Sequence, residues 1–260
     1  MDILTVAVKN SGLFRTNHTI TDIDMFLHRP LLLNALGLGL IFSWALPSFT
    51  LWPYLDDSVF WLFNRTISAD HPRWTTLLAA MNNRFYDAVV MLGMLTLMAS
   101  ACYRDPRGGW PRWLGIGVTM LLTAGVTALL VRYLVTYTHP SPTLLYPDAS
   151  RVSQFVDFAT KDQAGSSFPG DHGIMAMIFA GFMLSFGDRI TRIASLAIAT
   201  LAAAPRIMVG AHWLSDILVG SLSIVLLILP WALCTPLARR CSAAISGLAE
   251  RLAEGSAPRA

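Results

Sequence analysis

The sequence predicts an all-α integral membrane protein in which six transmembrane helices form one bundle. Of the 260 residues, 54% are hydrophobic and 13% are charged, which is too little polar surface to cover a soluble domain of this size. The chain also contains six apolar stretches, each near the length that a helix needs to cross the hydrocarbon core of a bilayer. We therefore expect lipid to be the solvent for most of the chain.

The expected spans are separated by connections of two kinds. Residues 104–112 and 187–192 are short, polar and rich in arginine, whereas residues 50–85 and 139–171 are long and mixed in composition. The six spans are predicted at residues 31–49, 86–103, 113–138, 172–187, 190–205 and 212–237.

This pattern predicts one membrane domain over residues 31–240, between an N-terminal segment at 1–30 and a C-terminal tail at 241–260. With both termini in the cytoplasm, twelve of the 19 basic residues fall on the inner side, as the positive-inside rule requires. The N-terminus lacks a basic region and a small-residue cleavage site, so the first span should remain as an anchor.

Two further segments are expected to be helical without crossing the membrane. Residues 54–82 mix aromatic and charged side chains, with Val59, Leu62 and Phe63 at helical spacing. We expect them to lie along the outer interface, in the first outer loop. The tail from residue 243 is predicted to be a short amphipathic helix that frays.

Composition excludes some functions. The formal net charge is +3, which is no signature of nucleic-acid binding. Cys102, Cys234 and Cys241 are spaced too irregularly for a metal site and should be reduced and structural.

The first cluster of chemically useful residues is SSFPGDHG at 166–173, where the fourth span begins. Pro169 and Gly170 predict a turn, and the backbone N–H groups of the following helix start would face an anion. His172 therefore stands where a phosphate would bind. The alternative is a histidine that caps the helix or lies at the interface.

The second cluster is PRIMVGAHWLSDILVG at 205–220. His212 and Asp216 are four residues apart, so they should share one helix face, with the carboxylate holding one imidazole nitrogen and leaving the other free to attack phosphorus. Arg206 could clamp phosphoryl oxygens in its planar fork. The alternative for Arg206 is a side chain that snorkels to lipid headgroups.

The third cluster is VRYLVTYTHPSPT at 131–143. Arg132 and His139 are seven residues apart, about two helical turns, and Pro140 limits continuation of the helix so that His139 can fold toward the same site. An interfacial arginine and a histidine at a chain end are the alternative.

Together the three clusters resemble the type 2 phosphatidic acid phosphatase (PAP2) superfamily, whose pattern is Lys-x6-Arg-Pro, then PSGH, then Ser-Arg-x5-His-x3-Asp. The resemblance implies that His212 is the nucleophile, Asp216 orients it and His172 is the acid and base. The phosphate-binding positions of the pattern correspond to Arg206, Arg132, His139, Gly170 and Asp171.

The sequence departs from that pattern at four positions. Gly170 replaces the serine, Asp171 the glycine, His139 the arginine and Pro205 the serine of the third motif. These departures point to one branch of the superfamily, the lipid A 1-diphosphate synthases, which residues 31–240 resemble. The branch motifs include MNNRFYD at 81–87, SPTL at 141–144, TKD at 160–162 and LPWALCTPL at 229–237.

This resemblance implies an enzyme that transfers the distal phosphate of undecaprenyl pyrophosphate to the 1-phosphate of lipid A through a phosphohistidine. It also implies a bacterial inner membrane, an active site facing the periplasm, these two lipids as substrates and the membrane as partner, with no nucleic acid and no cofactor. Polar residues of the outer loops are the candidates for substrate binding, namely Asn83, Arg84, Ser141, Lys161 and Ser167.

Three other interpretations stay open. The same chemistry with water as acceptor would make the protein an undecaprenyl pyrophosphate phosphatase or another lipid phosphatase. Loss of the superfamily's serine and arginine would suit a non-catalytic membrane protein. His139, His172, His212 and Asp216 could in principle bind a metal, but the arginines expected beside them would repel a divalent cation, so we expect no metal.

Overall fold

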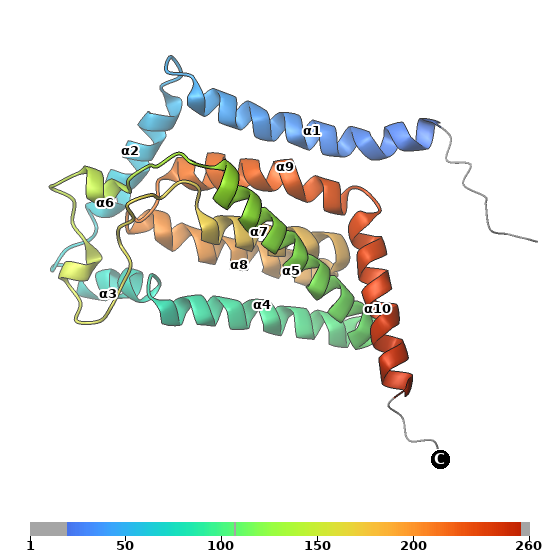
Figure 1. The fold of residues 1–260 in the computed structure, drawn as a ribbon. Coiled ribbons are helices and arrows are strands. Elements are labelled where there is room, and N and C mark those ends of the chain that lie inside the picture. The colour runs from blue at the N-terminus through green and yellow to red at the C-terminus, as the bar shows by residue number, and fades with distance from the viewer. Residues whose placement is uncertain (1–19, 107, 256–260) are drawn as a thin grey trace, which may run out of the picture.

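The computed structural model describes residues 20–106 and 108–255, with side chains described for residues 27–106 and 108–253. These residues form helices and connecting loops and no strand (Figure 1), so the all-α prediction is confirmed for them. The helices are α1 (Ile20–Ala45), α2 (Leu51–Asn64), α3 (Pro72–Ala80), α4 (Arg84–Arg104), α5 (Gly109–Leu134), α6 (Pro142–Leu145), the 3-10 helix η1 (Val152–Gln154), α7 (Asp171–Phe186), α8 (Arg189–Met208), the π-helix η2 (Asp216–Ser221), α9 (Leu222–Leu233) and α10 (Leu237–Gly255).

Every predicted span coincides with a helix, in chain order α1, α4, α5, α7, α8 and the continuous η2–α9 segment. Four are long and apolar enough to cross a membrane: α4, α5, α8 and η2–α9. The fifth, α7, is apolar but has 16 residues, which gives about 24 Å against a hydrocarbon core of about 30 Å. The predicted N-terminal segment 1–30 lies mostly outside the described residues.

The bundle is held together by close helix contacts at small residues. A core of buried apolar side chains joins α5, α7 and α9 and includes Ile116, Phe182 and Leu229. A Cβ added to Gly181 of α7 would lie 2.4 Å from a methyl carbon of Leu229, so a glycine is needed where α7 meets α9. Lipid tails are as apolar as the side chains, so burial between helices gives no hydrophobic gain in a membrane. Close packing at small residues drives helix association instead.

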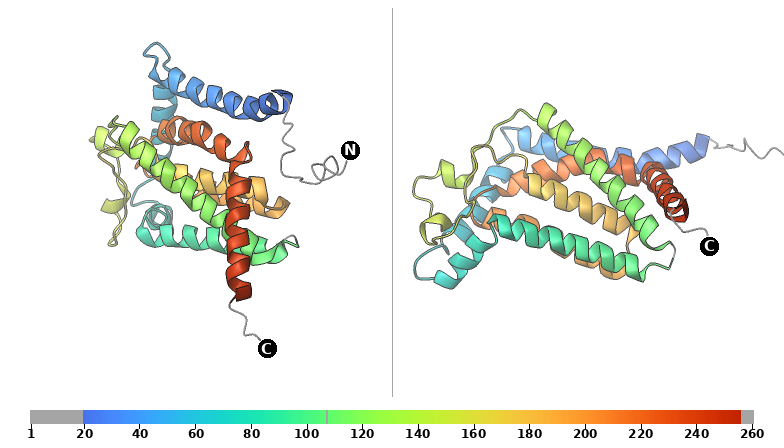
Figure 2. Two further views of the ribbon diagram at one scale, coloured as in Figure 1. Left: turned by 45° about the vertical axis from the view of Figure 1, so that its right-hand side comes forward. Right: turned by 60° about the horizontal axis from the view of Figure 1, so that its bottom comes forward.

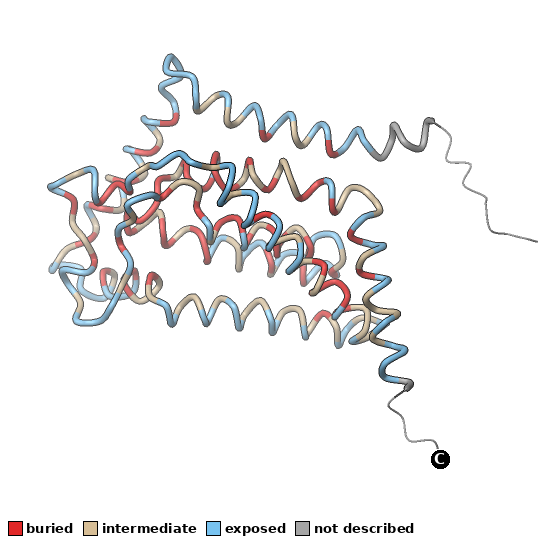
Figure 3. The backbone as a smooth tube through the Cα atoms, viewed as in Figure 1, coloured by how far each residue is buried: buried red, intermediate tan, exposed pale blue. Residues whose placement is uncertain are grey.

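Large apolar side chains on the outer faces of the bundle are exposed. On α4, which Figure 3 shows with little burial along its length, Met91, Leu92 and Leu95 are more than half exposed. Exposure of this kind is too extensive for a water-facing surface. It suits helices in contact with lipid.

The two ends of the bundle differ. At one end, α2, α3, α6 and the loop 135–170 lie together, and at the opposite end α10 lies across the bundle (Figures 1 and 2). We call the first the catalytic end because the predicted catalytic residues lie there. The expected outer-loop segment 54–82 forms α2 and α3. The structure contains no membrane, so its interfacial position stays a prediction.

Two predicted boundaries are wrong. The third span was expected to reach residue 138, but α5 ends at Leu134 and residues 135–141 have no regular secondary structure. Pro140 disfavours helical backbone at His139, the residue before it. The tail from residue 243 is helical as expected, but the helix begins earlier, because α10 runs from Leu237 to Gly255. It packs on α5, where a Cβ added to Gly115 would lie 2.3 Å from the carbonyl oxygen of Ser242.

Candidate active site

The predicted nucleophile lies in a tight turn between α8 and the last helix. Gly210 has a φ of +76°, in the left-handed region that glycine adopts at little cost. The turn brings the backbone N–H groups of Ala211 and His212 to the carbonyl oxygen of Arg206, at 3.0 and 3.1 Å. His212 therefore precedes the helix that carries Asp216, and our expectation that the two share a helix face is wrong.

His212 is held through its Nδ1 atom. The nearest partner of Nδ1 is the backbone carbonyl oxygen of Ser167, at 2.8 Å, and an oxygen of Asp216 lies at 3.5 Å. A carbonyl can only accept, so Nδ1 carries the proton and donates it. This tautomer leaves the lone pair on Nε2, which is the form that a nucleophile requires.

Asp216 is fully buried and connects three parts of the site. Its carboxylate accepts a hydrogen bond from the backbone N–H of Trp213 at 2.8 Å, and its other oxygen lies 3.3 Å from Nδ1 of His139. The His139 ring stacks on Trp213 at 5.6 Å between centroids. His139 is thus fixed against Asp216, and the buried carboxylate faces two imidazoles.

Ser167 ties the loop to the site. Its N–H and its hydroxyl both donate to the carbonyl oxygen of His139, at 2.7 and 2.8 Å. Its own carbonyl accepts the hydrogen bond from Nδ1 of His212. Ser141 is equally buried, and its hydroxyl accepts from the N–H of Ala164 at 2.9 Å. The hydroxyl of each predicted substrate-binding serine therefore makes a hydrogen bond within the loop.

Arg206 and His172 meet at the edge of the site. Arg206 is 3% exposed, and its Nη2 atom lies 3.4 Å from Nε2 of His172. On the other side of the ring, Nδ1 of His172 lies 2.8 Å from a carboxylate oxygen of Asp171. Arg206 and Nε2 of His172 thus face each other, as a phosphate-binding pair would, and Arg206 is joined to His212 through the backbone.

Gly170 lets α7 begin directly against η2. Its N–H donates to the carbonyl oxygen of Asp216 at 3.2 Å, and its own carbonyl accepts from the hydroxyl of Ser221 at 2.7 Å. A Cβ at Gly170 would lie 2.3 Å from Ile217. The position where the superfamily pattern has serine is therefore filled by close packing here, not by a hydroxyl.

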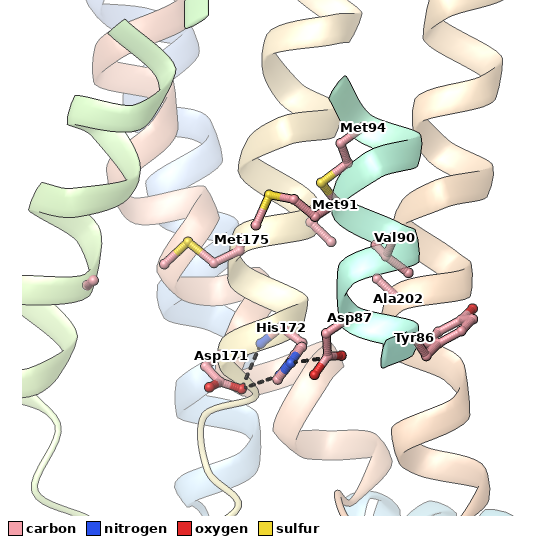
Figure 4. Close-up of a pocket in the computed structure, with 11 residues that line it drawn as sticks. Tyr86, Asp87, Val90, Met91, Met94, Asp171, His172, Met175 and Ala202 are labelled. Atoms are coloured by element: carbon pink, nitrogen blue, oxygen red, sulfur yellow. Dashed lines mark hydrogen bonds and ion pairs between the residues drawn. The ribbon is translucent and has the colours of Figure 1, made fainter. Parts of the chain in front are cut away.

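Two cavities meet at His172. One of about 430 Å³ is mostly apolar and lies between α4, α5, α7 and α8, with Val90, Met91, Met94 and Met175 on its walls (Figure 4). The other, of about 660 Å³, also has apolar walls from Phe85 and Phe158, but we call it the polar cavity because Asn83, Arg84, Lys161 and Arg206 line it. Three of the predicted substrate-binding residues thus lie in one cavity with two predicted catalytic or phosphate-binding residues.

Arg132 is the predicted site residue that the structure does not bring to the others. It is exposed in the last turn of α5, and no hydrogen bond or ion pair joins it to the predicted site residues within the described part of the chain. The irregular segment after Leu134 places His139 beside Asp216, whereas Arg132 stays on α5, away from these residues.

Two aspartates of the site were missed. Asp87, in the first turn of α4, pairs with Arg206 and lies 3.4 Å from Nε2 of His172. Asp56 of α2 is buried and accepts from the N–H and hydroxyl of Ser215, at 2.8 and 2.6 Å. A charged residue beside an apolar stretch was the available signal for both. Asp87 ends the MNNRFYD motif but was assigned no role, and Asp56 stands in no motif that we used.

The pKa of the Asp56 carboxyl is raised by its surroundings. Burial raises the pKa of its carboxyl to about 6 from an ordinary 3.8, against the two hydrogen bonds from Ser215, which lower it. Asp56 thus holds the start of the last helix through Ser215, although burying its carboxylate away from water costs free energy.

A metal centre finds no support in this geometry. Within residues 20–106 and 108–255, no three His, Cys, Asp or Glu side chains gather as metal ligands would. His139 and His212 both turn Nδ1 toward Asp216, and His172 turns Nδ1 to Asp171.

Comparison with known proteins agrees with the site. The model of the PAP2 superfamily matches residues 112–240, which include His139, His172, Arg206 and His212. The chain therefore belongs to the PAP2 superfamily, and the protein is a transmembrane, metal-independent lipid phosphatase or phosphotransferase.

The lipid A 1-diphosphate synthase of Escherichia coli (strain K12) is 40% identical over 210 residues, which cover 80% of this chain and 88% of that protein. This likeness confirms the resemblance inferred from the branch motifs. No solved structure shows a significant match.

Proposed function

We propose that the protein transfers the distal phosphate of undecaprenyl pyrophosphate to the 1-phosphate of lipid A, through a phosphohistidine on His212. The observation that carries the proposal is the 2.8 Å contact between Nδ1 of His212 and the carbonyl oxygen of Ser167, which directs the unprotonated Nε2 away from the buried carboxylate. The similarity to a lipid A 1-diphosphate synthase supports the two substrates.

In the first step, Nε2 of His212 attacks the distal phosphorus as the bond to the bridging oxygen breaks. The oxygen leaves with undecaprenyl phosphate, and His172 donates a proton to it. Arg206 stabilises the charge on the transferring phosphoryl oxygens. Asp216, 3.5 Å from Nδ1, compensates the positive charge that the attacked imidazole acquires.

In the second step, an oxygen of the lipid A 1-phosphate attacks the phosphorus, and the bond to Nε2 breaks. His212 recovers its neutral form, with the proton still on Nδ1. The acceptor phosphate is already anionic, so His172 removes only its one remaining proton, which restores the protonated His172 for the next cycle.

The two cavities offer separate places for the two lipids. The apolar cavity suits the prenyl chain of the donor, because methionines and a valine line most of it away from His172 (Figure 4). The polar cavity, with Arg84 and Lys161, suits the phosphorylated sugar of the acceptor, since two cations can neutralise phosphate. His139, Gly170 and Asp171 would complete the phosphate site as positioning groups.

The membrane placement follows from the same proposal. Six spans, α1, α4, α5, α7, α8 and η2–α9, would cross the inner membrane with both termini in the cytoplasm, the catalytic end would face the periplasm, and α2 and α3 would lie along the outer interface. The bias of basic residues supports this orientation.

The test uses purified protein with undecaprenyl pyrophosphate labelled at the distal phosphate, with and without lipid A. We expect label on lipid A, and a loss of at least about a thousandfold in His212→Asn. His71→Gln, at an exposed histidine before α3, is the matched control and should retain activity. Label released only as free phosphate would make the protein a phosphatase, and no turnover would favour a non-catalytic role.

A further inference from the structure

Asp87 occupies the place where a phosphoryl group would be expected. One oxygen of its carboxylate pairs with Nη2 of Arg206 and lies 3.4 Å from Nε2 of His172, the two atoms that face the proposed phosphate site. Asp87 also lies on the walls of both cavities, and Figure 4 shows it pointing toward His172 between α4 and α7. A carboxylate oxygen there has the charge and hydrogen-bonding capacity of a phosphoryl oxygen.

The two partners of the pair differ in their freedom to separate. The side chain of Arg206 is 4% exposed, whereas that of Asp87 is 38% exposed. The backbone of Arg206 is also fixed, because its carbonyl accepts hydrogen bonds from the N–H groups of Ala211 and His212. Asp87 can therefore rotate into water while Arg206 stays where it is.

A buried guanidinium without a counter-charge is unfavourable, so the empty site needs an anion. We infer that Asp87 is a displaceable internal anion, which neutralises Arg206 while the site is empty and is replaced there by the phosphoryl group of the substrate. This inference rests on the proposed function for the identity of the phosphate site.

Displacement of Asp87 has a favourable destination. The polar cavity that it borders is lined by Arg84 and Lys161, and Asp87 lies in the first turn of α4, where the helix dipole favours negative charge. The incoming phosphate thus competes with a carboxylate for Arg206 and His172, which lowers the affinity of the site for every anion, including the products.

The experiment measures binding of inorganic phosphate to the full-length protein in detergent, without lipids, by isothermal titration calorimetry. Asp87→Asn keeps the shape of the side chain and removes the competing charge, so we expect phosphate to bind about tenfold more tightly than to the wild type. Arg206→Gln should abolish binding, which shows that the probe reports on this site.

Asp188→Asn is the matched control, because it removes the aspartate of an Arg–Asp pair at the opposite end of the bundle and should leave phosphate affinity unchanged. Equal or weaker binding to Asp87→Asn would overturn the inference and make the pair merely structural. If that variant does not fold, Asp87→Ser tests the same expectation.

The outcome is separable from that of the proposed function. Tighter phosphate binding in Asp87→Asn without any transfer of label to lipid A would support the displaceable anion and reject the transferase. Label transfer with unchanged phosphate binding would do the reverse.

Discussion

The two ends of the bundle use the same residue types in different surroundings. At the catalytic end, the side chain of Arg206 is 4% exposed and pairs with Asp87. At the opposite end, Arg104 pairs with Asp188 at 3.0 Å, with side chains that are 33% and 46% exposed. Water screens the second pair, which therefore contributes little to stability, whereas a buried guanidinium in a membrane protein is costly and indicates a function.

The exposed pair has a local structural role. Asp188 accepts from the N–H of Thr191 at 2.8 Å and so caps α8, and the hydrogen bond from Arg104 holds the pKa of the Asp188 carboxyl well below its usual range. The pair ties the end of α4 to the start of α8. The charged pair at this end connects two helices, whereas at the catalytic end we propose that Arg206 binds phosphate.

The sharpest contrast should come from replacing arginine by lysine at each end. Arg206→Lys keeps the charge but loses the planar fork, and we expect kcat/KM for phosphoryl transfer to fall by about a hundredfold. Arg104→Lys should change it less than twofold. Comparable losses in both variants would mean that burial does not mark the functional arginine.

A second contrast concerns pH. Asp56 has a pKa of about 6 in the folded protein and an ordinary value of 3.8 when unfolded, so the folded state binds the proton more tightly. Stability should therefore be greatest below about pH 4 as far as this group is concerned, and should fall by up to about 3 kcal/mol as the pH rises through 6.

Thermal unfolding in detergent between pH 4 and 8 measures this trend. Asp56→Asn, which keeps an acceptor for the N–H of Ser215, should flatten the curve in that window. A wild-type stability that increases from pH 4 to pH 6 by an amount that Asp56→Asn removes would contradict the assignment.

Replacing a glycine by alanine should affect stability differently in the catalytic turn and in a transmembrane helix. Gly210→Ala forces a left-handed backbone on alanine and places a Cβ 2.7 Å from the Phe60 ring, so we expect a loss of about 1–3 kcal/mol in stability. Gly125→Ala, in the middle of α5 with nothing within 4 Å, should be neutral or slightly stabilising. Unfolding in denaturant checks both, and equal effects would show that the turn is not strained.

The smallest effect is expected for the exposed pair. Arg104→Gln should lower stability by less than about 1 kcal/mol and leave transfer activity intact. Unfolding temperature and label transfer, measured together, test this. A large loss of activity would show that the two ends are coupled, which the comparison does not predict.

The sequence predicted the helices well because apolar runs in lipid leave the backbone few alternatives. It also predicted that His172, Arg206, His212 and Asp216 lie near one another, because all four stand in the motifs that resemble the superfamily pattern. It could not predict the failure of Arg132 to join them, which depends on where α5 ends. It also could not show that a backbone carbonyl, that of Ser167, holds the nucleophile, because a carbonyl has no sequence signature.

Asp87 and Asp56 illustrate the same limit. Each contacts its partner across a long stretch of chain, Arg206 and Ser215 respectively, so only the packing of α4 against α8 and of α2 against the last helix reveals them. Departures from the superfamily pattern, such as Gly170, were visible in the sequence. The physical reason for a glycine at position 170, its close contact with Ile217, could be seen only in the structure.

The central claim is that Nε2 of His212 receives the phosphoryl group. The most direct measurement is rapid quenching of the enzyme with labelled undecaprenyl pyrophosphate in the absence of lipid A, followed by peptide mapping under alkaline conditions that preserve phosphohistidine. We predict label on His212 as the Nε2-phosphorylated isomer, disappearing when lipid A is added. Label on His172, on Nδ1 of His212 or on no residue during turnover would contradict the account.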